Sequence, residues 1–281
     1  MEVQRFAAFS QGDEGGNPAG VVLLREAATE AAMAQVAAQV GYSETAFAFP
    51  QDASGKQWRV RYFSPESEVP FCGHATIALG AVLGQRGGAG TYTLTLNDAT
   101  VTVDAEGGHD RMIATLTSPP TRSREVAAEE LQAALSLFSL TASDLDPRLA
   151  PARIHGGADH LVLPLKSRTT VAGMHYSLAE GRELMRRHGW VTVMLVFIEH
   201  DQTFIARNAF ASGGVLEDPA TGAAAAAFAG YLRDQAWPHG GAFKIRQGED
   251  MGSPSLIEVA LGDTPGSGVS VSGEVRMIAT G

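Results

Sequence analysis

The sequence predicts an α+β fold with two pseudo-symmetric lobes, each a β-barrel-like sheet wrapped around a central apolar helix. A strand–turn–helix segment occurs twice, and alignment of Gly73 with Gly222 also brings Leu83 onto Leu232. The helix that follows each of these glycines carries almost no polar side chain. Such a helix has no face for solvent and must be surrounded by other structure. Most of the remaining chain has the pattern of short strands, which can supply that covering.

The length of 281 residues and the repeat together favour two domains of ordinary size. The proline-rich segment Ser118-Pro119-Pro120 is the predicted boundary. We expect an N-terminal lobe of residues 1–118, with a possible returning strand at 273–281, and a C-terminal lobe of residues 119–272.

The N-terminal half predicts one ordinary helix besides the apolar one. Thr29 is its expected N-cap, and Met33, Val36, Ala37 and Val40 form an apolar stripe at helical spacing. Gly41 ends it as a left-handed residue. Residues 12–20 and 86–90 are expected to be loops, and Gly107-Gly108 a turn. The predicted strands are 3–9, 21–24, 46–49, 57–62, 92–96, 100–104 and 112–117.

The C-terminal half predicts two ordinary helices, at 125–138 and at 177–188, the second closed by Gly189. The predicted strands are 152–155, 160–165, 191–198, 202–210, 243–246, 256–261, 269–271 and 274–278.

Composition excludes several function classes. The net charge is −10 and no basic cluster extends beyond Arg186-Arg187, which disfavours a nucleic-acid partner. A single cysteine cannot form an internal disulfide, which suits a reducing compartment. The sequence shows neither a signal-peptide pattern nor an apolar segment of membrane-spanning length. We therefore expect a cytoplasmic protein with no membrane or nucleic-acid partner.

Common nucleotide and metal motifs are not found in the sequence. The glycines at 15–20 lack the Gly-Lys-Ser/Thr ending of a phosphate loop, and no Gly-x-Ser-x-Gly elbow exists. Scattered histidines and one cysteine predict no metal site. Cys72 lies two residues before His74, a spacing that does not bring side chains together on a helix, so we expect it to pack as a small buried hydrophobe.

Three titratable residues stand out as a candidate catalytic set: Glu44, His74 and Asp218. Each also has an ordinary explanation: Glu44 as a solvated loop carboxylate, His74 as a helix cap and Asp218 as a turn residue before Pro219. Two of them, however, lie at the starts of the paired apolar helices, where unpaired N–H groups and the helix dipole favour an anion. We expect all three to converge on one interlobe cleft.

The chain resembles the phenazine-biosynthesis PhzF-like family, which has the diaminopimelate-epimerase-like fold. The resemblance covers nearly the whole chain and rests on five segments in the family's order: Gly16-Asn17-Pro18-Ala19-Gly20, Ser43-Glu44-Thr45, Phe71-Cys72-Gly73-His74-Ala75-Thr76, Glu217-Asp218-Pro219-Ala220-Thr221-Gly222, and Gln247-Gly248 with Met251-Gly252-Ser253-Pro254-Ser255. The resemblance implies a homodimer without cofactor or metal. The family's characterised activity is isomerisation of a dihydro-hydroxyanthranilate by proton transfer.

The family pattern also assigns roles to residues of this chain. Glu44 matches the catalytic glutamate, His74 the histidine and Asp218 the aspartate. The expected substrate-binding residues are Asn17, Ser43, Gly73, Thr221, Gly222 and Ala223. At Ala223 the family commonly has serine, so this chain lacks a hydroxyl there, which puts substrate identity in question more than reaction type.

The predicted function is that of a cofactor-independent isomerase or epimerase, which moves a carbon-bound proton on a small carboxylate substrate. A catalytically silent small-molecule-binding protein on the same fold is the alternative, and a purely structural dimer would have no cleft. The sequence leaves open the substrate, the pathway and whether His74 or Asp218 relays the second proton.

Overall fold

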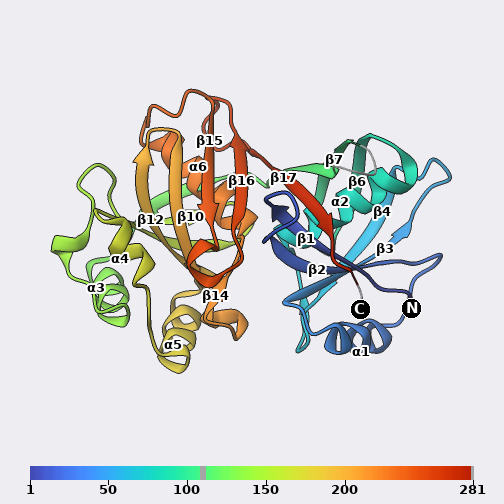
Figure 1. Ribbon diagram of the computed structural model, residues 1–281, viewed down its shortest axis with the longest axis horizontal. Coiled ribbons are helices and arrows are strands. Elements are labelled where there is room, and N and C mark those ends of the chain that lie inside the picture. The colour runs from blue at the N-terminus through green and yellow to red at the C-terminus, as the bar shows by residue number, and fades with distance from the viewer. Residues whose placement is uncertain (108–111, 280–281) are drawn as a thin grey trace. The chain divides into compact units, whose positions relative to one another are not determined.

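The computed structural model describes residues 1–107 and 112–279 and has a mixed α/β fold (Figure 1). The predicted Gly108 of one turn and residues 280–281 of the returning strand lie outside these ranges. The helices are α1 (Glu30–Val40), α2 (Gly73–Gly87), α3 (Ala128–Leu137), α4 (Arg168–Ala172), α5 (Leu178–His188) and α6 (Gly222–Asp234). Within the described residues, no helix is long and apolar enough to cross a membrane.

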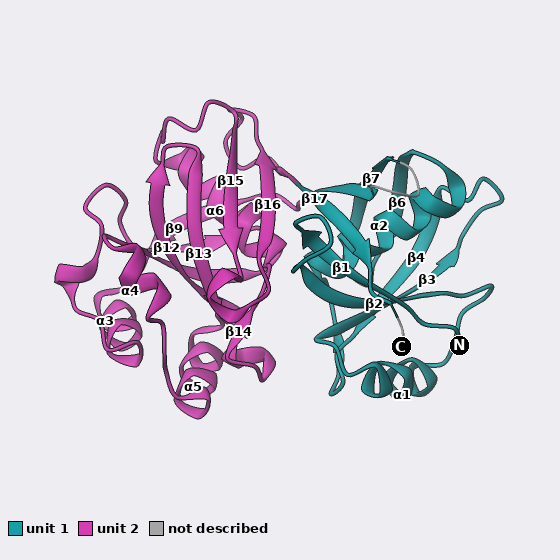
Figure 2. Ribbon diagram, viewed as in Figure 1, with its two compact units in different colours: residues 1–117, 272–281 teal, residues 118–271 magenta. Residues whose placement is uncertain are grey.

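The strands form two groups that belong to two compact units, coloured separately in Figure 2. Unit 1 comprises Met1–Thr117 and Ser272–Gly281, and unit 2 comprises Ser118–Val271. The earlier strands are β1 (Gln4–Ser10), β2 (Asn17–Leu23), β3 (Glu44–Pro50), β4 (Gln57–Phe63), β5 (Glu68–Val69), β6 (Gly90–Thr95), β7 (Thr100–Gly107) and β8 (Met112–Thr117). The later strands are β9 (Arg122–Glu125), β10 (Ala152–His155), β11 (Asp159–Leu165), β12 (Thr192–His200), β13 (Thr203–Ala209), β14 (Glu217–Asp218), β15 (Ala242–Gln247) and β16 (Ser255–Ala260). The last strand, β17 (Ser270–Met277), lies mostly in unit 1.

In unit 1 the apolar helix α2 packs against strands on several sides. It contacts β1, β2, β3, β6, β7 and β8, and every residue from Gly73 to Leu83 is buried. Close approach requires a small residue, since a Cβ added to Gly80 would lie 2.4 Å from a methyl carbon of Val103 in β7. The last strand, β17, completes the sheet by pairing antiparallel with β1.

In unit 2 the apolar helix α6 contacts β9, β10, β11 and β16. The turn between β10 and β11 comes so close to this helix that a Cβ on Gly156 would lie 2.7 Å from the backbone nitrogen of Ala227. Beside the sheet, α3 and α5 contribute to an apolar core that includes Leu163, Met185 and Trp190.

The two units share one order of strand pairing. In unit 1, β1 pairs with β2, β2 with β3 in parallel, β3 with β4, and β4 with both β5 and β6. The same pairings, with the same directions, recur in unit 2, where β10 to β15 correspond in order to β1 to β6.

Register relates individual residues of the two units. Phe63 faces Glu68 in unit 1 and Ala209 faces Glu217 in unit 2, so the two glutamates correspond. Glu68 forms an ion pair with Arg61, which lies two residues before Phe63. In the same way, Glu217 forms an ion pair with Arg207, which lies two residues before Ala209.

Several local predictions are confirmed because local capping chemistry decides them. Thr29 accepts a hydrogen bond from the Ala32 amide at the start of α1, and Gly41 ends this helix at a φ of 71°. Ser177 caps α5 in the same way, and Gly189 closes it at a φ of 70°.

Other predictions are wrong where pairing with a distant strand decides the structure. The predicted loop 12–20 becomes strand from Asn17 onward, because Asn17 and Pro18 pair with Ala8 and Ala7 of β1. The helix predicted from residue 125 begins at Ala128, since Arg122–Glu125 pairs with β10 as β9. The predicted loop 86–90 is partly helical, because α2 continues to Gly87, and the strands predicted at 269–271 and 274–278 are one strand, β17.

Candidate active site

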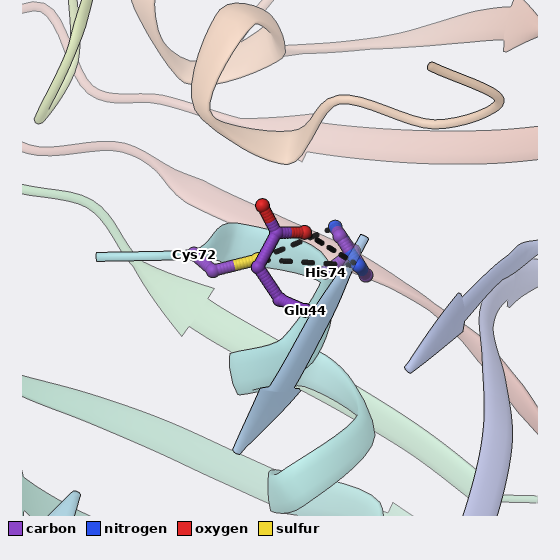
Figure 3. Close-up of side chains that lie close together, drawn as sticks. All are labelled: Glu44, Cys72 and His74. Carbon is purple, nitrogen blue, oxygen red and sulfur yellow. Dashed lines mark hydrogen bonds and ion pairs between the residues drawn. The ribbon is translucent and has the colours of Figure 1, made fainter. Parts of the chain in front are cut away.

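Three buried side chains of unit 1 converge at the N-terminus of α2: Glu44, Cys72 and His74 (Figure 3). Nε2 of His74 lies 3.5 Å from Oε2 of Glu44, and Nδ1 of the same ring lies 3.4 Å from Sγ of Cys72. The hydroxyl of Ser43 lies 3.4 Å from Nε2. The imidazole therefore connects a carboxylate, a hydroxyl and a thiol.

Local structure explains how these side chains reach one another. Gly41 ends α1, so that the chain reverses and β3 begins at Glu44, opposite Ala19 of β2. His74 is the second residue of α2, and Cys72 is its N-cap in an extended conformation, with φ −142° and ψ 114°. Glu44 is thus the first residue of a strand, whereas the predicted strand begins only at residue 46.

The expectation that Cys72 does not face His74 was wrong. It assumed helical geometry for both residues, whereas Cys72 is extended and lies outside the helix. Its burial was predicted correctly. Sequence reasoning therefore missed Cys72 as a member of the site, although its position directly before the helix-opening Gly73 could have indicated it.

The site can accept and return a proton. A carboxylate that is 7% exposed and contacts an imidazole can exchange a proton with it. The N-terminal end of α2 carries partial positive charge, which favours anionic groups at this position.

The same three side chains could also hold a metal ion. One donor atom from each lies within 4.8 Å of the other two, and thiolate, imidazole and carboxylate are the ligands that zinc prefers. Their mutual contacts give a metal-free explanation of the cluster, so the predicted lack of a metal stays a prediction.

Asp218 belongs to a buried hydrogen-bonded group of unit 2. Its Oδ2 accepts a hydrogen bond of 2.5 Å from the hydroxyl of Thr221, the N-cap of α6. Its backbone carbonyl accepts one of 2.6 Å from the side-chain amide of Gln247. Gln247 also accepts a hydrogen bond from the Thr221 amide at 3.3 Å. Sequence reasoning gave Gln247 no role, although the residue opens one of the family-like segments.

The predicted site residues fall into two groups by unit. In unit 1 the structure brings together Glu44, His74 and Ser43, with Gly73 as the first residue of α2. Asn17 is buried in β2. In unit 2 it brings together Asp218 and Thr221, followed by Gly222, the first residue of α6, and the half-buried Ala223. The convergence of both groups on one cleft stays a prediction.

A hollow of about 610 Å³ lies near the C-terminal end of α6. Its lining includes Arg233, Trp237, His239 and Asp263, and none of the predicted site residues.

Comparison with known proteins identifies the family of the chain. The sequence model of the PhzC-PhzF family, described as phenazine biosynthesis-like protein, matches residues 6–281. The chain belongs to the phenazine biosynthesis-like (PhzF) family. An "uncharacterized isomerase" of Deinococcus radiodurans is 34% identical over 269 residues, which cover 91% of this chain and 85% of that protein. The "uncharacterized isomerase YfhB" of Bacillus subtilis is 27% identical over 290 residues, or 99% and 98% of the two chains.

Solved structures agree with the fold. A "predicted epimerase" of Pseudomonas aeruginosa superposes with a TM-score of 0.84 at 25% identity, covering 99% of this chain and 96% of that one. A PhzF-family protein of Bacillus anthracis gives the same TM-score at 20% identity, covering 99% and 98%. A "probable proline racemase" of Agrobacterium radiobacter shares the fold alone, with a TM-score of 0.68 at 15% identity over 98% and 90% of the chains. With its relatives named isomerases, this PhzF-family chain is an enzyme of the isomerase class.

Proposed function

We propose that this PhzF-family protein is a cofactor-independent isomerase that moves a carbon-bound proton on a small carboxylate substrate. The observation that carries the proposal is the buried contact between the Glu44 carboxylate and the His74 imidazole at the start of α2. Glu44 removes the proton from carbon and returns it elsewhere on the substrate, and His74 exchanges protons with Glu44 or binds the substrate.

The substrate carboxylate binds at helix N-termini in this proposal. Both α2 and α6 begin with glycine, and the described residues show no side-chain hydrogen bond from either N-cap to its own helix. Backbone N–H groups at such ends bind anions and stabilise negative charge that develops during proton removal.

We extend the proposal to the architecture. The shared pairing order supports two pseudo-symmetric lobes, each with a barrel-like sheet around its apolar helix. Asp218 is a third catalytic residue in this proposal. The family resemblance further supports a cytoplasmic homodimer without bound metal. Sedimentation equilibrium and elemental analysis of the purified protein test these two points: a monomer, or zinc in molar proportion, would contradict them.

A silent binding protein is the second candidate, favoured by one observation. Position 223, in the first turn of α6, carries alanine and no hydroxyl, and the hydroxyl of Thr221, two residues before it, donates to Asp218. Neither position therefore offers a hydroxyl donor to a substrate, which suits binding without turnover.

A screen for isotope exchange separates the candidates. Small carboxylic acids with acidic C–H bonds are incubated with the protein in deuterium oxide, and deuterium uptake is followed by proton NMR and mass spectrometry. The isomerase proposal expects at least one acid to exchange at carbon in proportion to enzyme concentration. Tight calorimetric binding of an acid whose C–H protons never exchange would support the binding protein instead.

A further inference from the structure

A continuous chain of buried hydrogen bonds crosses unit 2 and ends at Asp218. Nδ1 of His160 in β11 lies 2.8 Å from the hydroxyl of Thr192 in β12. That hydroxyl donates to Oδ1 of Asn208 in β13 at 3.0 Å. Nδ2 of Asn208 donates to Oε1 of Gln247 in β15 at 3.0 Å. Each of these four side chains is at most 1% exposed.

The chain continues from Gln247 to the start of α6. Nε2 of Gln247 donates to the Thr221 hydroxyl at 3.1 Å, and the Thr221 hydroxyl donates to the carboxylate of Asp218 in β14. Side chains alone thereby connect β11, β12, β13, β15 and β14 with the N-terminus of α6.

All donors in this chain point the same way. A threonine hydroxyl has one proton, and that of Thr192 is directed at Asn208, so the bond to His160 must be donated by Nδ1–H. His160 therefore carries a proton on Nδ1, and its Nε2 has no hydrogen-bond partner among the described residues, as expected for the neutral Nδ1–H tautomer. Burial lowers the pKa of His160 to about 3, which agrees with a neutral ring. Hydrogen bonds aligned in one direction polarise one another, and this polarisation ends on the Asp218 carboxylate.

Strand register shows that Thr192 of this hydrogen-bonded series corresponds to Glu44 of unit 1. Glu44 opens β3 opposite Ala19 of β2, and Thr192 opens β12 opposite His160 of β11. Each follows by three positions the left-handed glycine that ends the preceding helix, Gly41 or Gly189. Thr192 therefore occupies in unit 2 the position of Glu44 in unit 1, with a neutral hydroxyl in place of the carboxylate.

We infer that His160, Thr192, Asn208 and Gln247 are positioning residues that fix Asp218 as an oriented hydrogen-bond acceptor for the reaction. This inference rests on the proposed isomerase function for its kinetic consequence only. Unit 2 then supplies an oriented acceptor, and proton transfer to and from carbon is left to the Glu44 group of unit 1.

Two substitutions at Thr192 separate positioning from folding. Thr192→Val keeps the shape and removes the hydroxyl, whereas Thr192→Ser keeps the hydroxyl and removes a methyl group. Tyr231→Phe is the matched control, because it deletes a part-buried hydrogen bond of unit 2, to the Ala150 carbonyl at 2.6 Å, that does not belong to the series from His160 to Asp218. We expect Thr192→Val to lower kcat for deuterium exchange about 10-fold, as a displaced catalytic group does. Thr192→Ser should restore most of the rate, and Tyr231→Phe should keep it.

NMR tests the chain without any substrate. Long-range ¹H–¹⁵N spectra should show His160 as the neutral Nδ1–H tautomer. The carboxyl ¹³C resonance of Asp218, assigned by its loss in Asp218→Asn, should move in Thr192→Val and stay in Tyr231→Phe at the same pH. An Nε2–H tautomer, or an Asp218 resonance that is the same in all three proteins, would overturn the inference. If no acid exchanges deuterium, the proposed function fails while these spectra still decide whether the chain orients Asp218.

Discussion

The carboxylate of Glu44 lies 3.5 Å from Nε2 of His74, and both side chains are more than nine-tenths buried. A carboxylate removed from water in this way is costly unless a hydrogen-bonding or cationic partner compensates it. The ring of His74 is such a partner, and it also contacts Cys72 and Ser43. Substitutions within this group should therefore affect proton transfer directly.

Glu44→Gln should lower the rate of deuterium exchange at least ~100-fold, the low end for the loss of a general acid–base. Glutamine keeps the size and a hydrogen-bonding group but cannot accept a proton. Calorimetry should show that the exchanging acid still binds. Glu26→Gln, at an exposed position of the same unit, is the control and should exchange at the wild-type rate. A Glu44→Gln variant that exchanges as fast as the wild type would rule out Glu44 as the base.

Cys72→Ala should lower the exchange rate about 10-fold, whereas Cys72→Ser should lose less, because a hydroxyl can still reach Nδ1 of His74. Since this is the only thiol of the chain, its alkylation by iodoacetamide is easily followed by intact mass. We expect slow modification of the buried thiol and slower modification still with the exchanging acid present. Equal rates in Cys72→Ala and wild type would show that the thiol only fills space.

The buried His160 should make the protein less stable in acid. Burial lowers its pKa from 6.5 to about 3, so between these pH values the unfolded chain binds a proton that the folded chain does not. The free energy of unfolding therefore falls as pH falls, by about 1.4 kcal/mol per pH unit in this window, or about 2 kcal/mol in total from pH 7 to pH 5. Urea unfolding at both pH values should show this loss, and His160→Gln should lack that part of it. Identical losses in both proteins would contradict the assignment.

The ion pair between Arg207 and Glu217 should matter far more than an exposed one. Its side chains are 12% and 6% exposed, so Glu217→Gln leaves a largely buried arginine without its charge partner and should cost about 3 kcal/mol in the free energy of unfolding. Lys244 and Glu258 form a pair whose side chains are 55% and 47% exposed, and Glu258→Gln should cost ~0.5 kcal/mol or less. Urea unfolding of the two variants measures both, and comparable losses would show that burial does not decide the strength of these pairs.

Much of the fold could be predicted because the residues that start and end its helices act locally. Thr29, Gly41, Ser177 and Gly189 act on their own helices, and alternation at Trp58, Val60 and Tyr62 identifies the buried face of β4. The two apolar helices could be predicted for the same reason, since their lack of polar residues is visible without knowledge of any partner.

The rest depends on distant partners that no local pattern encodes. Arg122–Glu125 becomes a strand because β10 lies beside it, and nothing in the composition of these residues indicates this. The buried chain from His160 to Asp218 is assembled from five strands and a helix end, so its members are ordinary polar residues in sequence. Within the candidate site, Glu44 and His74 were predicted from pattern and resemblance, whereas Cys72 required the extended conformation of the N-cap.

The pairing of β17 with β1 has a consequence for synthesis on the ribosome. β17 is synthesised after β1 and after nearly all of Ser118–Val271, which is continuous in sequence. Until β17 is made, β1 therefore has an unpaired edge, whereas unit 2 is nearly complete and can already fold. A chain truncated after Val271 should accordingly keep a protease-resistant unit 2, whereas its unit 1 exposes the edge of β1 and aggregates more readily than in the full chain.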